Sequence, residues 1–440
     1  MKNALPPFTP SRLAGACALL ATFTLAACGG GGDGGSAISL GGTVTNLSTN
    51  GLVLSDAGTT LSVPANATSF TFPGTVSGSY AVTILSQPSG QTCTVANGSG
   101  SSSSAVTNVA VTCRAYAVYV ANQTAGNIGQ FTVGAGGQLV AATTPTVATS
   151  GSPQSIVVSS DGLHGFVAYA DDNLVSNLSI DASGALSVAS GSPTALSQQD
   201  ALALSPDGSR LYAAENGAAK VSQFDVTNGL AGQAPALSLA ADINPSAIAV
   251  SADGQLVYVA NASANTVSGY GLDSNGNLAA LSPATTSTSS VGTGPRGIAT
   301  NPTGSMLYVT LGDSGKVAAY GYDGRGALTL KTSQATGSSP RGIAVTPNGS
   351  YAYVANAGSN TVSEYTLAGG SITPLSTPTV AAGTHPTAVA VSPDGLYAYV
   401  TNSGDGTVSQ YGIGSGGQLT PLATATVGSG GAGPMAIAIR

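Results

Sequence analysis

One repeated phrase dominates the chain. It is close to Pro-x-x-Ile-Ala-Val-Ser-Pro-Asp-Gly, followed by Leu-Tyr-Val-Ala-Asn and then by Thr-Val-Ser-x-Tyr. The phrase returns about every 46 residues from Tyr116 to the last residue, a period typical of repeat architectures. Four short apolar strands per copy favour a β-propeller over a helical solenoid. The repeat therefore predicts an all-β ring.

Aligning the copies on their Asp-Gly turn gives seven of them. Their leading positions are Pro153, Gln199, Pro245, Pro295, Pro340, Pro386 and Pro434. The chain enters this pattern at a second strand, 117–121, and leaves it after a first strand, 434–439. These two fragments together make one blade. We therefore expect the C-terminal strand to complete the N-terminal blade and close the ring without an exposed sheet edge.

Within a copy, the strands and turns follow from residue pattern. Leu256–Ala260 and Thr266–Tyr270 alternate with period two, which indicates strands with two unlike faces. Asp181, Asp273 and Asp323 are each followed three residues later by Gly, as in a turn between the third and fourth strands. The stretch that begins at Asp273 also looks like the start of a calcium loop. It lacks the distal Glu, so the turn is favoured over a calcium site.

Composition limits the class of protein. The chain has 440 residues, of which 42% are hydrophobic and 7% are charged, with 61 Gly. This length is enough for two domains, and the regular Val, Ile and Tyr spacing argues against disorder. The formal net charge of −7 argues against nucleic acid as a partner.

The N-terminus reads as an export signal. Lys2 and Arg12 precede an apolar run, 13–27, which is shorter than the roughly 20 residues that span a bilayer. Residues 1–27 are therefore predicted to be a signal peptide. The run ends in Leu-Ala-Ala-Cys28, which resembles the lipobox of bacterial lipoproteins. An ordinary signal peptide with a chance Cys is the alternative.

The lipobox resemblance implies that Cys28 is acylated and becomes the mature N-terminus, which makes the membrane a partner through a lipid anchor. Gly29 after the Cys implies the outer membrane, with the protein periplasmic or surface-exposed. Residues 28–36 are Gly-rich and read as a tether.

Cysteine usage agrees with export. Once Cys17 is removed and Cys28 is acylated, Cys93 and Cys113 remain, and we expect them to form one disulfide in an oxidising compartment. Metal ligation is the alternative, but two Cys without neighbouring His make a poor zinc site. Two His in the whole chain cannot build a multi-His site, and neither a metal nor a cofactor is expected.

Residues 37–114 read as short strands separated by turns and form the first predicted module. The expected strands are 52–54, 61–63, 70–72, 80–85, 92–95 and 106–113. The segments 78–85, 87–93 and 109–113 resemble the small immunoglobulin-like modules that follow the lipobox in bacterial surface lipoproteins. The resemblance implies a β-sandwich-like spacer with one disulfide. A glycan- or protein-binding role is the alternative.

The ring, residues 115–440, resembles a known family. Tyr258-Val-Ala-Asn261, Tyr353-Val-Ala-Asn356 and Tyr399-Val-Thr-Asn402 each follow a Pro-Asp-Gly-like turn and resemble the YVTN repeats of lactonase-like seven-bladed propellers. The resemblance implies a seven-bladed β-propeller. It leaves activity open, because that superfamily includes sugar-lactone hydrolases, cycloisomerases and surface proteins of no assigned chemistry.

Any ligand is expected at the mouth of the central channel, where the innermost strands begin. The residues after the leading positions are Gln154, Asp200, Ser246, Arg296, Arg341, Thr387 and Met435. The residues before them are Ser152, Gln198, Asn244, Gly294, Ser339, His385 and Gly433. The charged or titratable members of this double ring are the predicted ligand-binding residues: Asp200, Arg296, Arg341 and His385.

These residue types allow a definite chemistry. Paired arginines hold a carboxylate or phosphate bidentately, and a histidine can act as general base on a water that attacks a lactone carbonyl. The catalytic candidates are therefore His385, Arg296 and Arg341. The alternative is that Pro-Arg-Gly in the fourth and fifth copies is simple repeat duplication with solvated arginines. Relatives often carry His-Pro-Arg here, and this chain splits that combination.

The leading function predicted from the sequence is a monomeric, membrane-anchored, extracytoplasmic scaffold that binds an unknown protein or a small anionic ligand. The alternative is a lactonase-like hydrolase of the sugar-lactone type with its site at the channel mouth. A purely structural role in the envelope is a third possibility.

Overall fold

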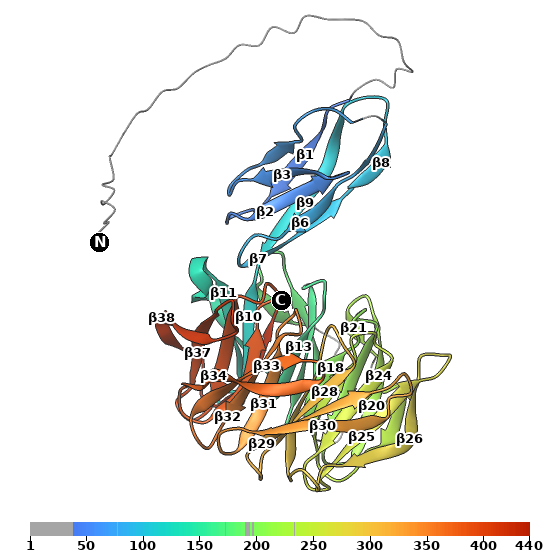
Figure 1. Cartoon of the computed structure of the whole chain (residues 1–440), viewed down its shortest axis with the longest axis vertical. Coiled ribbons are helices and arrows are strands. Elements are labelled where there is room, and N and C mark those ends of the chain that lie inside the picture. The colour runs from blue at the N-terminus through green and yellow to red at the C-terminus, as the bar shows by residue number, and fades with distance from the viewer. Residues whose placement is uncertain (1–37, 77, 172, 190–193, 196–197, 233) are drawn as a thin grey trace, which may run out of the picture.

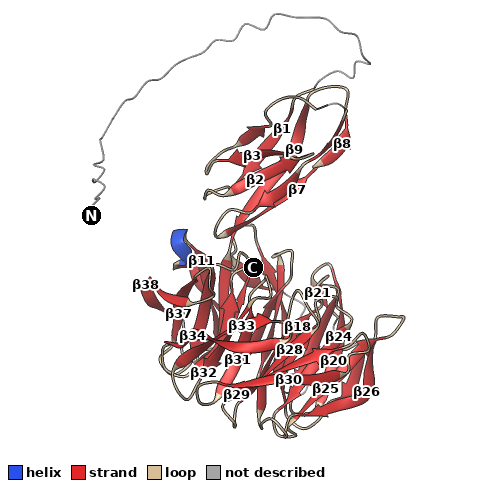
Figure 2. Cartoon of the chain, viewed as in Figure 1, coloured by secondary structure: helices blue, strands red, loops and turns tan. Residues whose placement is uncertain are grey.

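The computed structural model describes residues 38–440 except 77, 172, 190–193, 196–197 and 233, and shows a small β module joined to a large β ring (Figure 1). Strands make up the regular structure of the described residues apart from one short 3-10 helix, η1 (Ala135–Gly137) (Figure 2). The predicted signal peptide and tether lie outside the described residues. In the part of the chain that is described, no helix is long and apolar enough to cross a membrane.

Seven antiparallel sheets form the blades of the ring, each with four strands on its main path. Blade 2 contains β13 (Pro153–Val158), β14 (His164–Tyr169), β15 (Leu174–Ile180), β16 (Leu186–Val188) and β17 (Thr194–Ala195). Blade 3 contains β18 (Gln199–Leu204), β19 (Arg210–Glu215), β20 (Lys220–Thr227), β21 (Leu230–Ala231) and β22 (Leu237–Ala240). Blade 4 contains β23 (Pro245–Val250), β24 (Leu256–Asn261), β25 (Thr266–Leu272) and β26 (Leu278–Ser287).

The remaining blades repeat this order. Blade 5 contains β27 (Pro295–Thr300), β28 (Met306–Leu311), β29 (Lys316–Tyr322) and β30 (Leu328–Ala335). Blade 6 contains β31 (Pro340–Val345), β32 (Tyr351–Asn356), β33 (Thr361–Ala368) and β34 (Ser371–Ala381). Blade 7 contains β35 (Pro386–Val391), β36 (Tyr397–Asn402), β37 (Thr407–Ile413) and β38 (Leu419–Gly428).

Blade 1 confirms the predicted closure. Its sheet order is β12 (Leu139–Ala148), β11 (Asn127–Val133), β10 (Ala117–Asn122) and β39 (Pro434–Ile439), so the last strand of the chain pairs antiparallel with the first strand of the ring. The innermost strands contact one another in sequence, and β39 lies between β35 and β13. The ring therefore has no open edge between its first and last blades.

The second strand of each blade departs from the expected two unlike faces. In β24 all six residues are buried, because each blade packs against a neighbour on both sides. The apolar clusters accordingly join adjacent blades: Val118 and Val120 of blade 1 share a core with Tyr399 of blade 7. Solvent exposure falls instead on the outer strands such as β26.

Tyrosine hydroxyls also join neighbouring blades. Four second-strand tyrosines donate to the carbonyl of a turn glycine in the next blade over 2.7 to 2.9 Å: Tyr119 to Gly184, Tyr258 to Gly326, Tyr353 to Gly417 and Tyr399 to Gly137. Each acceptor glycine has positive φ in the turn between the third and fourth strands. The predicted turn residues therefore also hold adjacent blades together.

The small module contains two sheets and a two-stranded pair. Its sheets have the orders β4 (Ser69–Thr71), β1 (Leu40–Thr45), β9 (Val106–Ala115), β7 (Gln91–Ala96) and β3 (Thr59–Val63), β2 (Leu52–Asp56), β6 (Thr83–Ser86), and the pair is β5 (Ser79–Ala81) with β8 (Ser99–Ser101). Both sheets contribute to one core that contains the predicted Cys93–Cys113 disulfide, which is present. The immunoglobulin-like assignment stays a prediction.

Strand β1 was not predicted, because its Leu-Gly-Gly sequence is atypical of a strand interior. The structure explains the glycine: a Cβ on Gly42 would lie 1.9 Å from the carbonyl oxygen of Val109 in β9. Only glycine allows this approach between the two strands.

The module packs on one face of the ring. Strand β9 runs through the buried Tyr116 directly into β10. The amide of Gly90 donates to Asp394 Oδ2 at 3.1 Å, and Arg114 Nη1 donates to the carbonyl of Asp161 at 3.0 Å. Both aspartates belong to the Asp-Gly turns that follow innermost strands. The module therefore lies on the face opposite the one where those strands begin.

Candidate functional site

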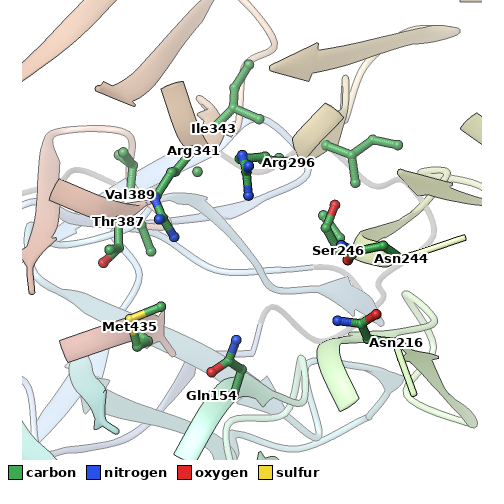
Figure 3. A pocket seen from close by; sticks show the side chains of 15 residues that line it. Gln154, Asn216, Asn244, Ser246, Arg296, Arg341, Ile343, Thr387, Val389 and Met435 are labelled. Carbon is green, nitrogen blue, oxygen red and sulfur yellow. The ribbon is translucent and has the colours of Figure 1, made fainter. Parts of the chain in front are cut away.

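A cavity of about 460 Å³ opens where the innermost strands begin (Figure 3). Its lining includes the residue after the leading position in six of the seven blades: Gln154, Ser246, Arg296, Arg341, Thr387 and Met435. The predicted convergence of these positions at the channel mouth is therefore observed for these six. Asp200 lies in β18, but its side chain is outside the described residues.

Strand geometry explains which side chains reach the cavity. Residues i and i+2 of a strand point to the same face, so Arg296 and Ile298 both line it, as do Arg341 and Ile343. The cavity thus has charged groups at the strand starts and apolar groups one step along the strands. Asn216 also lines it, from the loop that follows β19.

Glycine brings the two arginine-bearing strands close together. A Cβ on Gly297 would lie 2.1 Å from the carbonyl oxygen of Arg341. The Thr310 hydroxyl accepts from the amide of Gly297 at 2.8 Å and lies 2.6 Å from the Arg341 carbonyl, to which it donates. The Pro-Arg-Gly sequence therefore sets the spacing of β27 and β31 as well as supplying charge.

The two arginines differ in their partners. Arg296 Nη2 lies 3.4 Å from Asp313 Oδ1, and 42% of the Arg296 side chain is exposed. Arg341 is half-buried, and among the described residues no hydrogen bond or ion pair engages its guanidinium. Burial lowers the pKa of Arg341, and the charge of Arg296 lowers it further. Arg341 is therefore a partly desolvated cation that has no counterion among the residues whose side chains the structure describes.

The wall opposite the arginines carries neutral polar groups (Figure 3). It contains the side chains of Gln154, Asn216, Asn244 and Ser246. Ser246 Oγ donates to the carbonyl of Pro295 at 2.9 Å and so also ties β23 to β27. Amides and hydroxyls of this kind can bind the hydroxyl groups of a ligand whose anionic end lies on the arginines.

His385 was expected in the same pocket as the arginines, and the structure places it differently. Its side chain is exposed and is not among the lining residues, although Thr387, two positions along the chain, is. Burial and the nearby charge of Arg341 lower the pKa of His385. The histidine is therefore a neutral group beside the cavity at neutral pH.

The backbone at His385 has a conformation that recurs at this position of the repeat. Its φ of 57° lies in the left-handed region, where the equivalent residues Asn244, Gly294, Ser339 and Gly433 also lie. A non-glycine residue there costs about 1 to 3 kcal/mol unless its surroundings hold it. The amide of His385 donates to Asn360 Oδ1 at 2.8 Å, and its Nδ1 lies 2.9 Å from Ser403 Oγ.

The remaining candidates separate from this site. Cys28 lies outside the described residues. Asp273 Oδ1 accepts from the amides of Asn275 and Asn277, so it stabilises the predicted turn. No group of three His, Cys, Asp or Glu side chains within the described ranges could hold a metal ion. His164 is half-buried, and its ring lies against Gly229 in a turn of blade 3.

The family model for the seven-bladed lactonase β-propeller matches residues 182–439. The chain belongs to this family. The predicted seven-bladed fold is thereby confirmed, together with the lactonase-like resemblance of its repeats. No curated protein matches the chain.

Solved structures share the fold at low identity. A periplasmic gluconolactonase from Pseudomonas aeruginosa is 20% identical with a TM-score of 0.63, and the match covers 74% of this chain and 98% of that one. A Bacteroides fragilis protein provisionally assigned as a 6-phosphogluconolactonase is 16% identical with a TM-score of 0.63 and the same coverage of both chains. Because both identities are below 25%, these likenesses establish the fold alone.

Proposed function

We propose that this protein is a lactonase-like hydrolase that acts outside the cytoplasm on an anionic sugar lactone. The proposal rests on the half-buried guanidinium of Arg341, which has no partner among the described residues. Together with Arg296 it lines the cavity at the mouth of the channel, here called the mouth cavity. A desolvated cation without a counterion favours an anionic ligand. The likeness to a gluconolactonase supports the choice of lactone.

In the proposed reaction, Arg341 and Arg296 hold the carboxylate or phosphate of the substrate, and the neutral wall binds its hydroxyl groups. His385 accepts a proton from water while the water oxygen bonds to the lactone carbonyl carbon. The ring carbon–oxygen bond then breaks, the released oxygen takes up the proton, and the product is a hydroxy acid.

A binding scaffold is the second candidate, and one observation favours it. His385 lies outside the cavity lining, and the described lining contains no carboxylate that could act as a base in its place. The same arginines would then hold an anionic ligand without turning it over.

Turnover of aldonolactones with and without a phosphate or carboxylate substituent tests the proposal. We expect the purified protein to hydrolyse the anionic lactone, and Arg341→Ala to lower kcat/KM about a hundredfold. Arg325→Ala is the control, because Arg325 is an exposed turn residue outside the cavity lining. Anion binding without hydrolysis would support the scaffold, and neither binding nor hydrolysis would refute both functions.

The cellular site belongs to the same proposal. The lipobox-like sequence before Cys28 and the single disulfide support a lipid-anchored protein of the outer membrane. We expect Cys28→Ala to abolish incorporation of labelled fatty acid and release the protein from the membrane fraction. Membrane association that is unchanged in this variant would refute the anchor.

A further inference from the structure

His385 and Ser403 are joined by more than one contact. Ser403 Oγ lies 2.9 Å from His385 Nδ1 and 3.1 Å from the carbonyl oxygen of His385. The amide of Ser403 donates to that same carbonyl at 3.0 Å. The hydroxyl therefore lies between the ring and the backbone of one histidine.

The position of one proton decides how many of these contacts are hydrogen bonds. If the Ser403 hydroxyl donates its proton to Nδ1, no proton lies between Ser403 Oγ and the carbonyl oxygen of His385. That second contact is then not a hydrogen bond. If the hydroxyl donates to the carbonyl, Nδ1 must carry a proton and donate to Oγ. Only the Nδ1–H tautomer makes both contacts hydrogen bonds, so this environment favours it.

We propose that Ser403 is a positioning residue that holds His385 as the Nδ1–H tautomer and so leaves Nε2 as the proton acceptor. Nε2 has no hydrogen-bond partner within the described ranges, so it is open to a water molecule. The tautomer follows from the local contacts alone. Its use in catalysis rests on the proposed lactone hydrolysis.

The left-handed backbone of His385 is a feature of the repeat. The equivalent residues Asn244, Gly294, Ser339 and Gly433 have the same conformation. The amide of His385 donates to Asn360 Oδ1, as the amide of Gly294 donates to Asn265 Oδ1 in blade 5, so this bond holds the backbone of His385 in place.

The charged neighbours are consistent with a neutral ring. The nearby charge of Arg341, from β31, opposes protonation of His385. Asp405, in the loop that follows β36, accepts from the amide of Thr384 at 2.7 Å and from the hydroxyl of Thr407 at 2.6 Å. Its carboxylate therefore has partners other than the imidazole.

Nitrogen NMR of the intact protein labelled in histidine tests the tautomer without any substrate. The chain contains two histidines, so two sets of ring resonances are expected, and His385→Asn assigns them. Above the pKa of His385, we expect Nδ1 to be protonated and Nε2 to be unprotonated. Loss of one hydrogen bond in Ser403→Ala should shift the tautomer ratio roughly fivefold toward Nε2–H. Ser403→Thr should restore the native ratio, and His164 is the internal reference.

The two parts of the inference fail separately. A native protein with mainly Nε2–H at His385, or a ratio unchanged in Ser403→Ala, refutes the tautomer assignment. If the tautomer is as expected and the native protein hydrolyses lactones, Ser403→Ala should lower kcat with KM unchanged, and Ser403→Thr should recover kcat. Equal kcat in all three proteins refutes the positioning role. If the tautomer is confirmed but the protein hydrolyses no lactone, the proposed function is refuted and the tautomer assignment is unaffected.

Discussion

The hydroxyl of Tyr399 donates to the carbonyl of Gly137 over 2.7 Å, and so joins the seventh blade to the first. Residues 262 positions apart are linked by this bond. We expect Tyr399→Phe to lower the free energy of unfolding by about 1 kcal/mol, because a buried carbonyl loses its donor. Urea unfolding followed by tyrosine fluorescence measures the change.

Tyr212 provides the matched control. It holds the same position in blade 3, but its buried hydroxyl has no partner in the described structure, and Gly276, the expected acceptor, is bound by Gln223 instead. Tyr212→Phe should therefore be neutral or stabilising. Equal destabilisation by both changes would contradict a role for the hydrogen bond.

Removal of β39 (Pro434–Ile439) and Arg440 should destabilise the whole ring. Without β39, strand β10 has an unpaired inner edge, and the apolar contacts of Ile437 and Ile439 with the cluster shared by blades 1 and 7 are lost. We expect a single large drop in melting temperature, or failure to fold. A melting temperature equal to that of the full chain would refute closure by this strand.

Gly297→Ala should disturb the fold and the site together. The new Cβ would lie 2.1 Å from the carbonyl oxygen of Arg341, and backbone cannot yield as a flexible side chain does. We expect the free energy of unfolding to fall by about 3 kcal/mol, and anion binding to weaken, because β27 and β31 must separate. At Gly304 a Cβ meets nothing within 4 Å, so Gly304→Ala should change stability by less than about 0.5 kcal/mol. Calorimetric titration with inorganic phosphate and urea unfolding compare the two variants.

Glu364 should give the ring a dependence on pH. Its buried carboxylate accepts from the amide of Leu419 at 2.8 Å, and burial raises its pKa above the usual value of about 4.3. The folded state therefore holds this proton more tightly than the unfolded chain. The stability that the protonated form contributes is fully present below the unfolded pKa and is lost as pH rises through the folded pKa.

Glu364→Gln should remove this dependence and stabilise the ring by about 1 kcal/mol at pH 8. Gln410, at the equivalent position, accepts from the amide of Leu139 at 2.6 Å and also donates to the carbonyl of Thr424 at 2.8 Å. The reverse change, Gln410→Glu, should introduce the pH dependence. Urea unfolding of the native protein and both variants at pH 4 and pH 8 measures these effects. Aspartates with a lowered pKa, such as Asp253, contribute equally to native protein and variant, so the stability difference between Glu364→Gln and the native protein reports on Glu364. A difference that is the same at both values of pH would contradict the assignment.

The repeat predicted most of the ring because its strands and turns are local patterns that recur. Closure by β39 and the Asp273 turn followed from position and spacing, and the Cys93–Cys113 disulfide followed from the two cysteines that remain after export. Strand β1 did not, because its glycines serve a tertiary contact with β9 that no local pattern encodes.

The site was predicted in part. Six residues after the leading positions were placed correctly at the channel mouth, since equivalent positions of a ring converge. The apolar part of the lining, such as Ile298, was missed although the two-residue period of a strand implies it. Asn216 was missed because its loop carries no repeated residue. His385 lies outside the lining although Asn244, at the equivalent position and with the same left-handed backbone, lines the cavity, so position in the repeat does not decide which of these side chains reaches it.

The parallel pairing of β1 with β9 fixes the end of the module at which the described chain enters it. Leu40 pairs with Val106 at one end and Thr45 with Thr112 at the other, and β9 then continues into the ring. The described chain therefore enters the module at the end remote from the ring, and the mouth cavity opens on the ring's far face. The module and the cavity that Arg341 lines therefore lie on opposite faces of the ring, so a ligand can reach the cavity without passing the module.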